Sequence, residues 1–447
     1  MGIIIRQSIS NSIISYVGIA LGLLNTLYFY PNILTKEQLG LVQLLLAVSM
    51  IFVQFVQLGV VNTVIKFFPQ FREYSEKNNG FLFLSLLIPT IGLTIFSIAF
   101  PFIREPLLSY YANSSLFQEN YLFILPLIFG LVFFNVLNSY SRALNRSIPG
   151  SFVSEVYIRL GVIGLLIALY FGEIDYYVFL IGLTLCYVSQ SFIMTGYLTA
   201  IRELRIKPNF SFFDKKLFKR ISNYSFYSFF GGINNIIVSR IDIIMISAIM
   251  GLADTAVYTI AFYVGNVIVV PQKSIGKIAP SLISKYLHDN NLKEVARIYK
   301  STSINQFIPG CLFFIGIWAN LENLLDILPD DYRDAGLVIL IIGASRLINM
   351  VSGINGVIIT NSKYYRFNLL ATTLLIVITI ITNYLLIPLY GIVGAALATV
   401  VSLFLYNLIK FLFVWIRLSM QPFNMELIYV TLISALDRKS TRLNSSH

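Results

Sequence analysis

Charged residues are scarce in this chain of 447 residues: Asp, Glu, Lys and Arg make up only 12%, about half of their share in an ordinary soluble domain. Hydrophobic residues make up 57% and recur in long runs along nearly the whole length. The scarcity of charge excludes a soluble globular protein, and the even spread of the apolar runs excludes a single membrane anchor. We therefore expect a chain that crosses a membrane many times.

Histidine and cysteine are almost absent, with two of each. His288 and His447 do not have the spacing of a metal site, and one internal histidine cannot support a Ser-His-Asp arrangement. Cys186 and Cys311 each lie inside an apolar run, so we expect buried thiols without a disulfide. We expect no metal, no cofactor and no enzymatic activity.

Nucleotide-binding motifs are missing as well. The chain contains no G-x-x-x-x-G-K-[ST] stretch, the loop that cradles nucleotide phosphates, so an ATP-driven motor is excluded. The net charge of +11 would suit nucleic acid binding, but Lys and Arg gather in alternate turns between the apolar runs. The basic residues therefore indicate membrane topology, and no nucleic acid partner is expected.

A membrane-spanning helix needs about 20 apolar residues, and twelve runs of the chain meet this need. They lie at about 10–34, 39–66, 80–101, 120–142, 152–171, 176–199, 223–250, 256–280, 304–325, 335–358, 368–387 and 392–416. A thirteenth run begins at 424–436 and stops at the polar tail "DRKSTRLNSSH", which we expect to be non-native. The turns after even-numbered spans hold most Lys and Arg, which predicts a cytoplasmic N-terminus.

Two stretches of the chain repeat after six spans. "ISNSIISYVG" (9–18) recurs as "ISNYSFYSFFGG" (221–232), and "EQLGLVQLLLAV" (37–48) aligns with "ADTAVYTIAFYV" (253–264). Such parallel repeats predict two six-helix lobes related by a two-fold axis along the membrane normal, with a site between them. Chance similarity of apolar runs is the alternative. The expected fold is an all-α integral membrane protein with these parts: lobe 1–200, basic linker 201–222, lobe 223–417, truncated span 418–436 and non-native tail 437–447.

Charges in mid-membrane are the first candidates for a site. Arg240 lies ten residues before the outer end of its span at Met250, and Arg346 lies eleven residues after the outer start of its span at Ala335. At about 1.5 Å per residue, both lie roughly 15 Å deep, where an ionised group must face protein or water. With Asp242 they predict an interior electropositive site. The alternative is a structural ion pair between Asp242 and Arg346.

Further polar residues follow helical spacing in the second lobe. Span ten continues the face of Arg346 through three positions: Asn349, Gly353 and Gly356. One stripe of span eight contains residues at intervals of three and four, among them Asn266, Lys273 and Lys277. The two lysines lie toward the cytoplasm, where snorkelling anchors are the favoured interpretation.

The first lobe carries amides rather than charges. Gln54 and Gln57 lie on one side of span two, and span four carries a polar stripe of three residues: Asn135, Asn138 and Arg142. Amide side chains can exchange hydrogen bonds with sugar hydroxyls. They can equally hold neighbouring helices together, and the sequence leaves both interpretations open.

The spans also carry a family resemblance. "NYLLIPLYGIVGAALATVVS" (383–402) is similar to the turn between spans eleven and twelve of bacterial polysaccharide flippases, which belong to one superfamily with the multidrug (MATE) exporters and the lipid II flippases. "SRIDIIMISAIMGLADTAVYTIAF" (239–262) resembles their junction of spans seven and eight, with Ala256 where the family usually has glycine two residues before tyrosine. Gly40 fits the first-lobe pattern, whereas Val42 replaces the usual aromatic residue. The resemblance covers residues 1–436.

The resemblance implies a transporter of lipid-linked oligosaccharide units on undecaprenyl diphosphate, working by alternating access among the lipids of the bacterial inner membrane. The sequence leaves the oligomeric state open, with a monomer favoured. A proton or a sodium ion is a candidate coupling ion, and the membrane potential is the third candidate driving force. A diphosphate needs cationic partners, which Arg240 and Arg346 offer. The alternatives are a lipid II flippase and a MATE-type exporter of organic cations, but such an exporter needs an interior acid that the first four spans lack.

Overall fold

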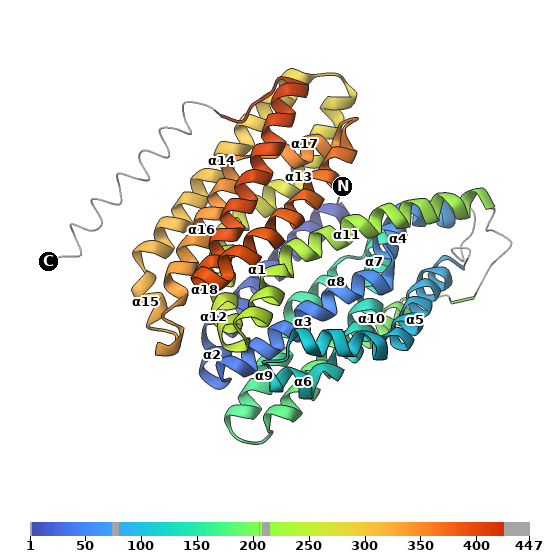
Figure 1. Ribbon diagram of the computed structural model, residues 1–447. Coiled ribbons are helices and arrows are strands. Elements are labelled where there is room, and N and C mark those ends of the chain that lie inside the picture. The colour runs from blue at the N-terminus through green and yellow to red at the C-terminus, as the bar shows by residue number, and fades with distance from the viewer. Residues whose placement is uncertain (1, 74–79, 205, 208–214, 424–447) are drawn as a thin grey trace. The chain divides into compact units, whose positions relative to one another are not determined.

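The computed structural model describes residues 2–73, 80–204, 206–207 and 215–423. Within these ranges the regular secondary structure is helical and no strand occurs, which confirms the all-helical prediction (Figure 1). Eleven of the described helical segments are long and apolar enough to cross a membrane. The chain is therefore a multi-pass membrane protein. The predicted thirteenth span at 424–436 and the polar tail lie outside the described residues.

The chain divides into two compact units, Met1–Ala253 and Asp254–His447. The main helices of unit 1 are α1 (Gly2–Leu24), α2 (Tyr30–Ile33), α3 (Lys36–Gln57), α4 (Val60–Glu73), α5 (Phe81–Tyr110), α6 (Ser115–Asn120), α7 (Ile124–Ala143), α8 (Ile148–Phe152), α9 (Ile158–Tyr170), α10 (Tyr176–Ala200) and α11 (Lys215–Ile249). Short π-helical and 3₁₀ segments join some of them: η1 (Asn25–Phe29), η3 (Tyr121–Phe123) and η4 (Val153–Tyr157). The two units are described separately below.

Unit 2 begins within α12 (Leu252–Asn266). Its other helices are α13 (Val270–His288), α14 (Leu292–Ala319), α15 (Leu321–Leu325), α16 (Ala335–Val351), α17 (Asn355–Asn361) and α18 (Tyr365–Leu418), with the 3₁₀ segments η6 (Val267–Val269) and η7 (Asp330–Tyr332). The sequence puts α11 at the start of the second lobe, whereas its contacts with α3 and α4 place it in unit 1. The lobe boundary at 201–222 stays a prediction, and part of that linker lies outside the described residues.

The number of spans depends on how α18 is divided. This helix runs for 54 residues, but Gly391 has a non-helical backbone (φ 60°, ψ −140°), so two helices meet there. The predicted spans 368–387 and 392–416 lie on either side of this kink. The predicted number of twelve spans and the two-bundle symmetry stay predictions.

Capping residues define where several helices begin. Thr35 forms a capping box with Gln38: its hydroxyl accepts from the Gln38 backbone N–H (3.3 Å), and the Gln38 amide oxygen accepts from the Thr35 N–H (3.0 Å). At the start of α10 the Asp175 carboxylate accepts from the Val178 N–H (2.7 Å). These bonds satisfy N–H groups that the first turn of a helix leaves without partners, and they fix where each apolar run enters its helix.

Each unit has its own apolar core. In unit 1 it joins α4, α5 and α7 through a group of buried aromatic residues: Phe68, Phe71, Phe81 and Tyr140. In unit 2 it joins α13, α17 and α18 through aliphatic residues: Ile283, Ile358 and Val414. Cys311 is buried as predicted, whereas Cys186 is only half-buried, so the prediction of two buried thiols is wrong for Cys186. The cores fix the helices that carry the polar residues discussed below.

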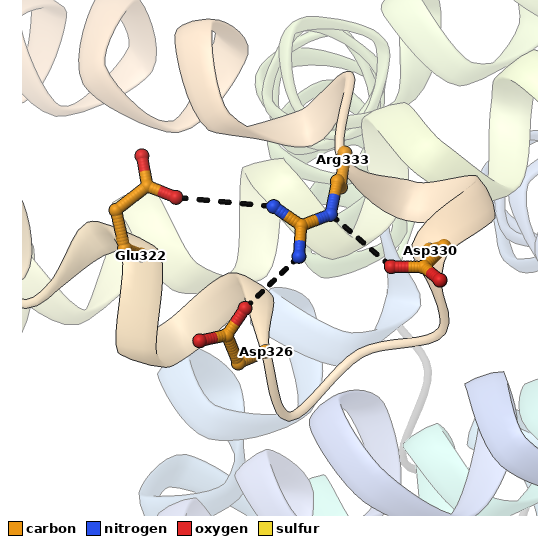
Figure 2. Close-up of polar contacts among 4 residues, drawn as sticks. All are labelled: Glu322, Asp326, Asp330 and Arg333. Atoms are coloured by element: carbon orange, nitrogen blue, oxygen red, sulfur yellow. Dashed lines mark hydrogen bonds and ion pairs between the residues drawn. The ribbon is translucent and has the colours of Figure 1, made fainter.

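A small ion cluster stabilises the connection between α15 and α16 in unit 2. Figure 2 shows the Arg333 guanidinium among three carboxylates, at 3.0 Å from Asp326, 3.2 Å from Asp330 and 3.9 Å from Glu322. All four side chains are largely exposed to solvent, so water screens each pair and each contributes little to stability. The cluster ties this acidic turn together and lies apart from the buried polar groups of the unit.

The second predicted span is broken, which corrects the continuous helix expected over 39–66. α3 ends at Gln57, Leu58 (φ 45°) and Gly59 (φ 75°) adopt left-handed backbone conformations, and α4 begins at Val60. Left-handed geometry ends a helix and is natural for glycine. In the sequence the only sign of this break is an isolated glycine within an apolar run.

Helix α11 packs against this break and satisfies its polar groups. The Thr63 hydroxyl donates to the Gly59 carbonyl (3.1 Å) and lies 2.7 Å from the Ser225 hydroxyl. The Asn62 amide donates to the Ser228 hydroxyl (2.8 Å). Irregular backbone at membrane depth is tolerated where protein or a water-filled cavity surrounds it. The hydrogen bonds with α11 therefore stabilise the break within the folded unit 1.

We expect Gly59→Ala to destabilise the protein much more than Gly172→Ala. Both glycines have φ near 75°, so an alanine at either position meets the left-handed penalty of about 1–2 kcal/mol. A Cβ at Gly59 would also lie 2.7 Å from the Phe229 backbone nitrogen, with the Ser225 carbonyl closer still, whereas a Cβ at Gly172 meets nothing within 4 Å. Thermal unfolding in detergent measures both. Equal melting temperatures would show that α11 does not press against the break.

Candidate functional site

A pocket of about 400 Å³ lies beside the break in unit 1, within the range of about 300–1,000 Å³ typical of small-molecule sites. Residues of α3, α4, α7 and α11 line it. Broken membrane helices recur at transporter binding sites, because a break exposes backbone and side-chain polar groups to a cavity. The α3–α4 break and this pocket therefore form the first candidate site.

The pocket wall combines apolar surface with several amide and hydroxyl groups. The lining side chains that can form hydrogen bonds include Gln54, Gln57, Asn62, Asn135, Asn235 and Ser239, and none of the lining residues is charged. The buried Gln57 amide donates to the Gln54 oxygen (2.8 Å) and its own oxygen accepts from Asn135 (3.4 Å). The structure thus brings together three of the predicted site residues, Gln54, Gln57 and Asn135.

Arg240 lies one turn beyond the pocket on α11. Ile236 lines the pocket, and Arg240 follows it at i+4, on the same face of the helix. Long side chains on a helix lean toward its N-terminus, which here is the direction of Ile236. The Arg240 Nε is buried and has no hydrogen-bond partner among the described residues. A guanidinium with an unsatisfied donor on a candidate membrane-spanning helix is suited to an anionic ligand.

Asp242 lies two residues further along α11 and is buried. A fixed hydrogen bond lies close to it in sequence: the Tyr111 hydroxyl donates to the Ile244 carbonyl (3.4 Å). Burial, reinforced by the neighbouring Tyr110, raises the pKa of Tyr111 above its ordinary value. The predicted ion pair of Asp242 with Arg346 would join residues of different units and stays a prediction.

Unit 2 contains a second polar arrangement, a row of four side-chain amides from four helices. Asn349 on α16 donates to Gln272 on α13 (3.2 Å), Asn407 on α18 donates to Asn349 (3.2 Å), and Asn355 on α17 donates to Asn407 (3.5 Å). Arg346 precedes Asn349 by one turn, and its guanidinium lies 5.2 Å from the centre of the Phe262 ring. The row gives hydrogen-bond partners within the unit to Asn355 and Asn407, which are buried.

Two predicted helical faces of unit 2 are interrupted. α16 ends at Val351, and Gly353 has a left-handed backbone (φ 62°) before α17 begins at Asn355. The face expected to run from Asn349 through Gly353 to Gly356 is therefore not one helix face, and that prediction is wrong. In span eight the 3₁₀ segment η6 (Val267–Val269) separates Asn266 from Lys273, so the predicted continuous stripe is wrong as well.

The remaining predicted residues do not join either arrangement. The Asn266 amide donates to the Phe262 carbonyl of its own helix (2.8 Å), and Lys273 is exposed. The Lys277 side chain lies outside the described part of the structure. Arg142 is exposed near the end of α7. The Asn138 side chain packs so closely against Gly150 that a Cβ at position 150 would collide with the Asn138 amide. Asn138 therefore fits the interpretation of an amide that packs helices together.

Sequence reasoning missed several polar residues of both arrangements. In unit 1 these line the pocket: Asn62, Ser228, Asn235 and Ser239. In unit 2 they are buried or hydrogen-bonded within the bundle: Gln272, Asn355, Asn407 and Lys410. Asn407 and Lys410 carry a signal that could have been used, since they are an i, i+3 polar pair inside an otherwise apolar run.

The fold is that of a known class of membrane transporters. It matches an inward-facing MATE-family multidrug resistance transporter of the MOP superfamily with a TM-score of 0.74, covering 90% of this chain and 94% of that one at 15% identity. It matches the lipid II flippase MurJ in an inward closed conformation with a TM-score of 0.71, covering 96% and 91% at 15% identity. At such low identity these likenesses show the fold alone.

The family follows from the sequence comparison. The model of the polysaccharide biosynthesis protein family matches residues 4–282, which is more than half of the chain. The chain belongs to this family. It also resembles the probable low-salt glycan biosynthesis flippase Agl15 of Haloferax volcanii, with 22% identity over 197 residues, a match that spans 44% of this chain and 41% of that protein.

Proposed function

We propose that the protein is a flippase that carries lipid-linked oligosaccharide units across a bacterial inner membrane, with undecaprenyl diphosphate as the carrier lipid. Membership of the polysaccharide biosynthesis family and the likeness to a glycan biosynthesis flippase support this. The N-terminus lies in the cytoplasm, and the protein acts as a monomer by alternating access. It performs no covalent chemistry on its substrate.

The observation that carries the proposal is the composition of the pocket in unit 1. Its wall offers amide and hydroxyl groups, which match the hydroxyls of a sugar, and carries no charge. Arg240 follows one turn further along α11 with an unsatisfied donor. A neutral polar pocket beside a cation is complementary to a glycan joined to a diphosphate. We assign the glycan to the pocket and the phosphates to Arg240.

Other predicted residues have supporting roles in this proposal. Asp242 orients or gates the headgroup beside Arg240, and Arg346 and Asn349 are the candidate polar groups of unit 2. Lys273 and Lys277 act as anchors at the membrane surface. A MATE-type exporter of organic cations is a weaker candidate, because the pocket lacks the carboxylate that would hold a cation.

We expect the purified protein to bind an undecaprenyl-diphosphate-linked disaccharide at least tenfold more tightly than ethidium, since a charge-assisted hydrogen bond contributes about 1.5–3 kcal/mol. Binding in detergent to fluorescent forms of both ligands measures this, and lipid II serves as a third ligand. Expression in a strain that lacks its own polysaccharide flippase should restore surface polymer. Tighter binding of ethidium, with no restored polymer, would assign the protein to the drug exporters. Selective binding of lipid II would favour the lipid II flippase function.

A further inference from the structure

Lys410 is a buried cation within the membrane part of unit 2. It lies on α18, eight residues before the end of the helix at Leu418, and its side chain is only 5% exposed. Eight residues correspond to about 12 Å of helix. A lysine at such a position usually extends along the helix until its ammonium reaches water. The Lys410 side chain instead points into the protein, so it is not a snorkelling anchor.

Residues of three segments surround the Lys410 ammonium: the second half of α18, its first half and α17. Its Nζ donates to the Tyr406 hydroxyl one turn back on α18 (3.0 Å), and that hydroxyl lies 3.4 Å from the Thr372 hydroxyl in the first half of α18. Gly356 on α17 leaves room for it, because a Cβ there would lie 2.6 Å from Nζ and 3.7 Å from the Asn368 amide oxygen. That amide oxygen is buried and has no hydrogen-bond partner among the described residues.

Among the residues that the structure describes, no carboxylate forms an ion pair with Lys410. Helices α13, α16, α17 and α18 contain no Asp or Glu. Charged or titratable groups on the elements packed around it include Tyr406, Arg346 on α16, Tyr299 on α14, Lys273 on α13 and Arg366 near the start of α18. The Lys277 side chain lies outside the described part of α13. The single acid of α14, Glu294, lies in its first turn and forms an ion pair with Arg297 (2.8 Å), and the other charged groups named here are cations, so none of them is a fixed counter-ion for Lys410.

Such a site suits a proton better than a metal cation. Sodium-like hard cations require several oxygen ligands, usually with a carboxylate, and an ammonium in the same place repels them. Lysine is also the basic side chain that can lose its proton inside a protein, whereas arginine cannot. A hydroxyl both donates and accepts, so Tyr406 can accept from the ammonium and donate to the neutral amine.

We propose that Lys410 is the proton-carrying group through which a proton gradient drives transport. In the release step one N–H bond of the ammonium breaks, its electron pair stays on Nζ, and the proton passes to water on one side of the membrane. In the uptake step the neutral amine takes a proton from water on the other side. The proposal rests on the transport function proposed above for its substrate, and it assigns the coupling ion that the sequence leaves open.

The test uses full-length protein in liposomes with a fluorescent undecaprenyl-diphosphate-linked disaccharide as the probe. A gradient of one pH unit should let the wild-type protein sustain up to about a tenfold excess of the probe in one leaflet, the limit that one transported proton per probe provides. Lys410→Met and Lys410→Arg should both lose this dependence, because one has no proton to exchange and the other cannot release it. Their affinity for the probe should stay within about twofold of wild type. Lys273→Met, which changes an exposed lysine of the same unit, should behave as wild type.

A purely structural role for Lys410 gives a different pattern. Arginine would then retain gradient dependence, and this result would overturn the proposal. If neither variant folds, the wild-type protein is tested alone: transport of the probe in weakly buffered liposomes should move protons across the membrane, which a pH-sensitive dye detects. Transport of the probe without proton movement overturns the role of Lys410 and leaves the flippase function standing. No binding of the probe overturns the flippase function and the coupling proposal together.

Discussion

Arg240→Ala should abolish polymer export while the protein remains abundant. Alanine removes a mid-membrane guanidinium whose Nε has no hydrogen-bond partner among the described residues, so no described hydrogen bond to that atom is lost. A charge-assisted hydrogen bond to phosphate contributes about 1.5–3 kcal/mol, so affinity for undecaprenyl-diphosphate lipids should fall about 10- to 150-fold. Binding in detergent and surface polymer in a flippase-deficient strain measure the two effects.

Two further variants separate charge from geometry in this experiment. Arg240→Lys should restore affinity only in part, because an ammonium keeps the charge but lacks the planar fork that pairs two phosphate oxygens. Arg220→Ala, an exposed arginine at the other end of α11, is the matched control and should bind as wild type. If the Arg240→Ala variant binds undecaprenyl-diphosphate lipids as tightly as the wild-type protein, Arg240 does not bind the phosphates. If the Arg240→Ala variant is much less abundant in the membrane than the wild-type protein, Arg240 has a structural role.

The all-helical membrane fold could be predicted because it depends on one strong sequence signal, the long apolar runs. In a membrane every backbone group must be satisfied within its own segment, so long apolar runs become helices with little regard to their detailed sequence. Several predicted spans accordingly coincide with single described helices, as 176–199 does with α10 (Tyr176–Ala200). The break at Leu58 and Gly59 could not be predicted in the same way. It depends on α11, which lies far along the chain and satisfies the polar groups of the break.

The candidate site was predictable only where single helices determine it. Gln54 and Gln57 are three residues apart on α3, so helical spacing alone brings them together. Asn235 and Ser228 also line the pocket, but they reach it because α11 packs beside α3 and α4, a tertiary fact that spacing on one helix cannot supply. The prediction of one continuous polar face on span ten was wrong for a related reason. The left-handed backbone of Gly353 turns the chain before Gly356, and one glycine in an apolar run is a weak sign of such a turn.

Gln57→Leu should weaken binding of the glycan without weakening binding of the carrier lipid. Gln57 is 4% exposed and connects Gln54 to Asn135 on the pocket wall. Leucine has a similar volume, so the packing of α3 should remain. The Asn135 amide would lose the oxygen that accepts its hydrogen bond, and the pocket would lose the amide oxygen and the amide nitrogen of Gln57. Loss of about 1–2 kcal/mol predicts a roughly 5- to 30-fold weaker affinity for the disaccharide-linked lipid and an unchanged affinity for bare undecaprenyl diphosphate.

The comparison of the two lipids makes this prediction specific to the pocket. Arg240→Ala should weaken binding of both lipids, because both carry the diphosphate, whereas Gln57→Leu should weaken only the one that carries sugar. Gln190→Leu is the matched control: it changes another buried glutamine of unit 1 that does not line the pocket, and it should leave both affinities unchanged. If Gln57→Leu weakens binding of both lipids equally, the glycan does not occupy the pocket at the α3–α4 break. Gln57 would then serve to hold α3 against α7.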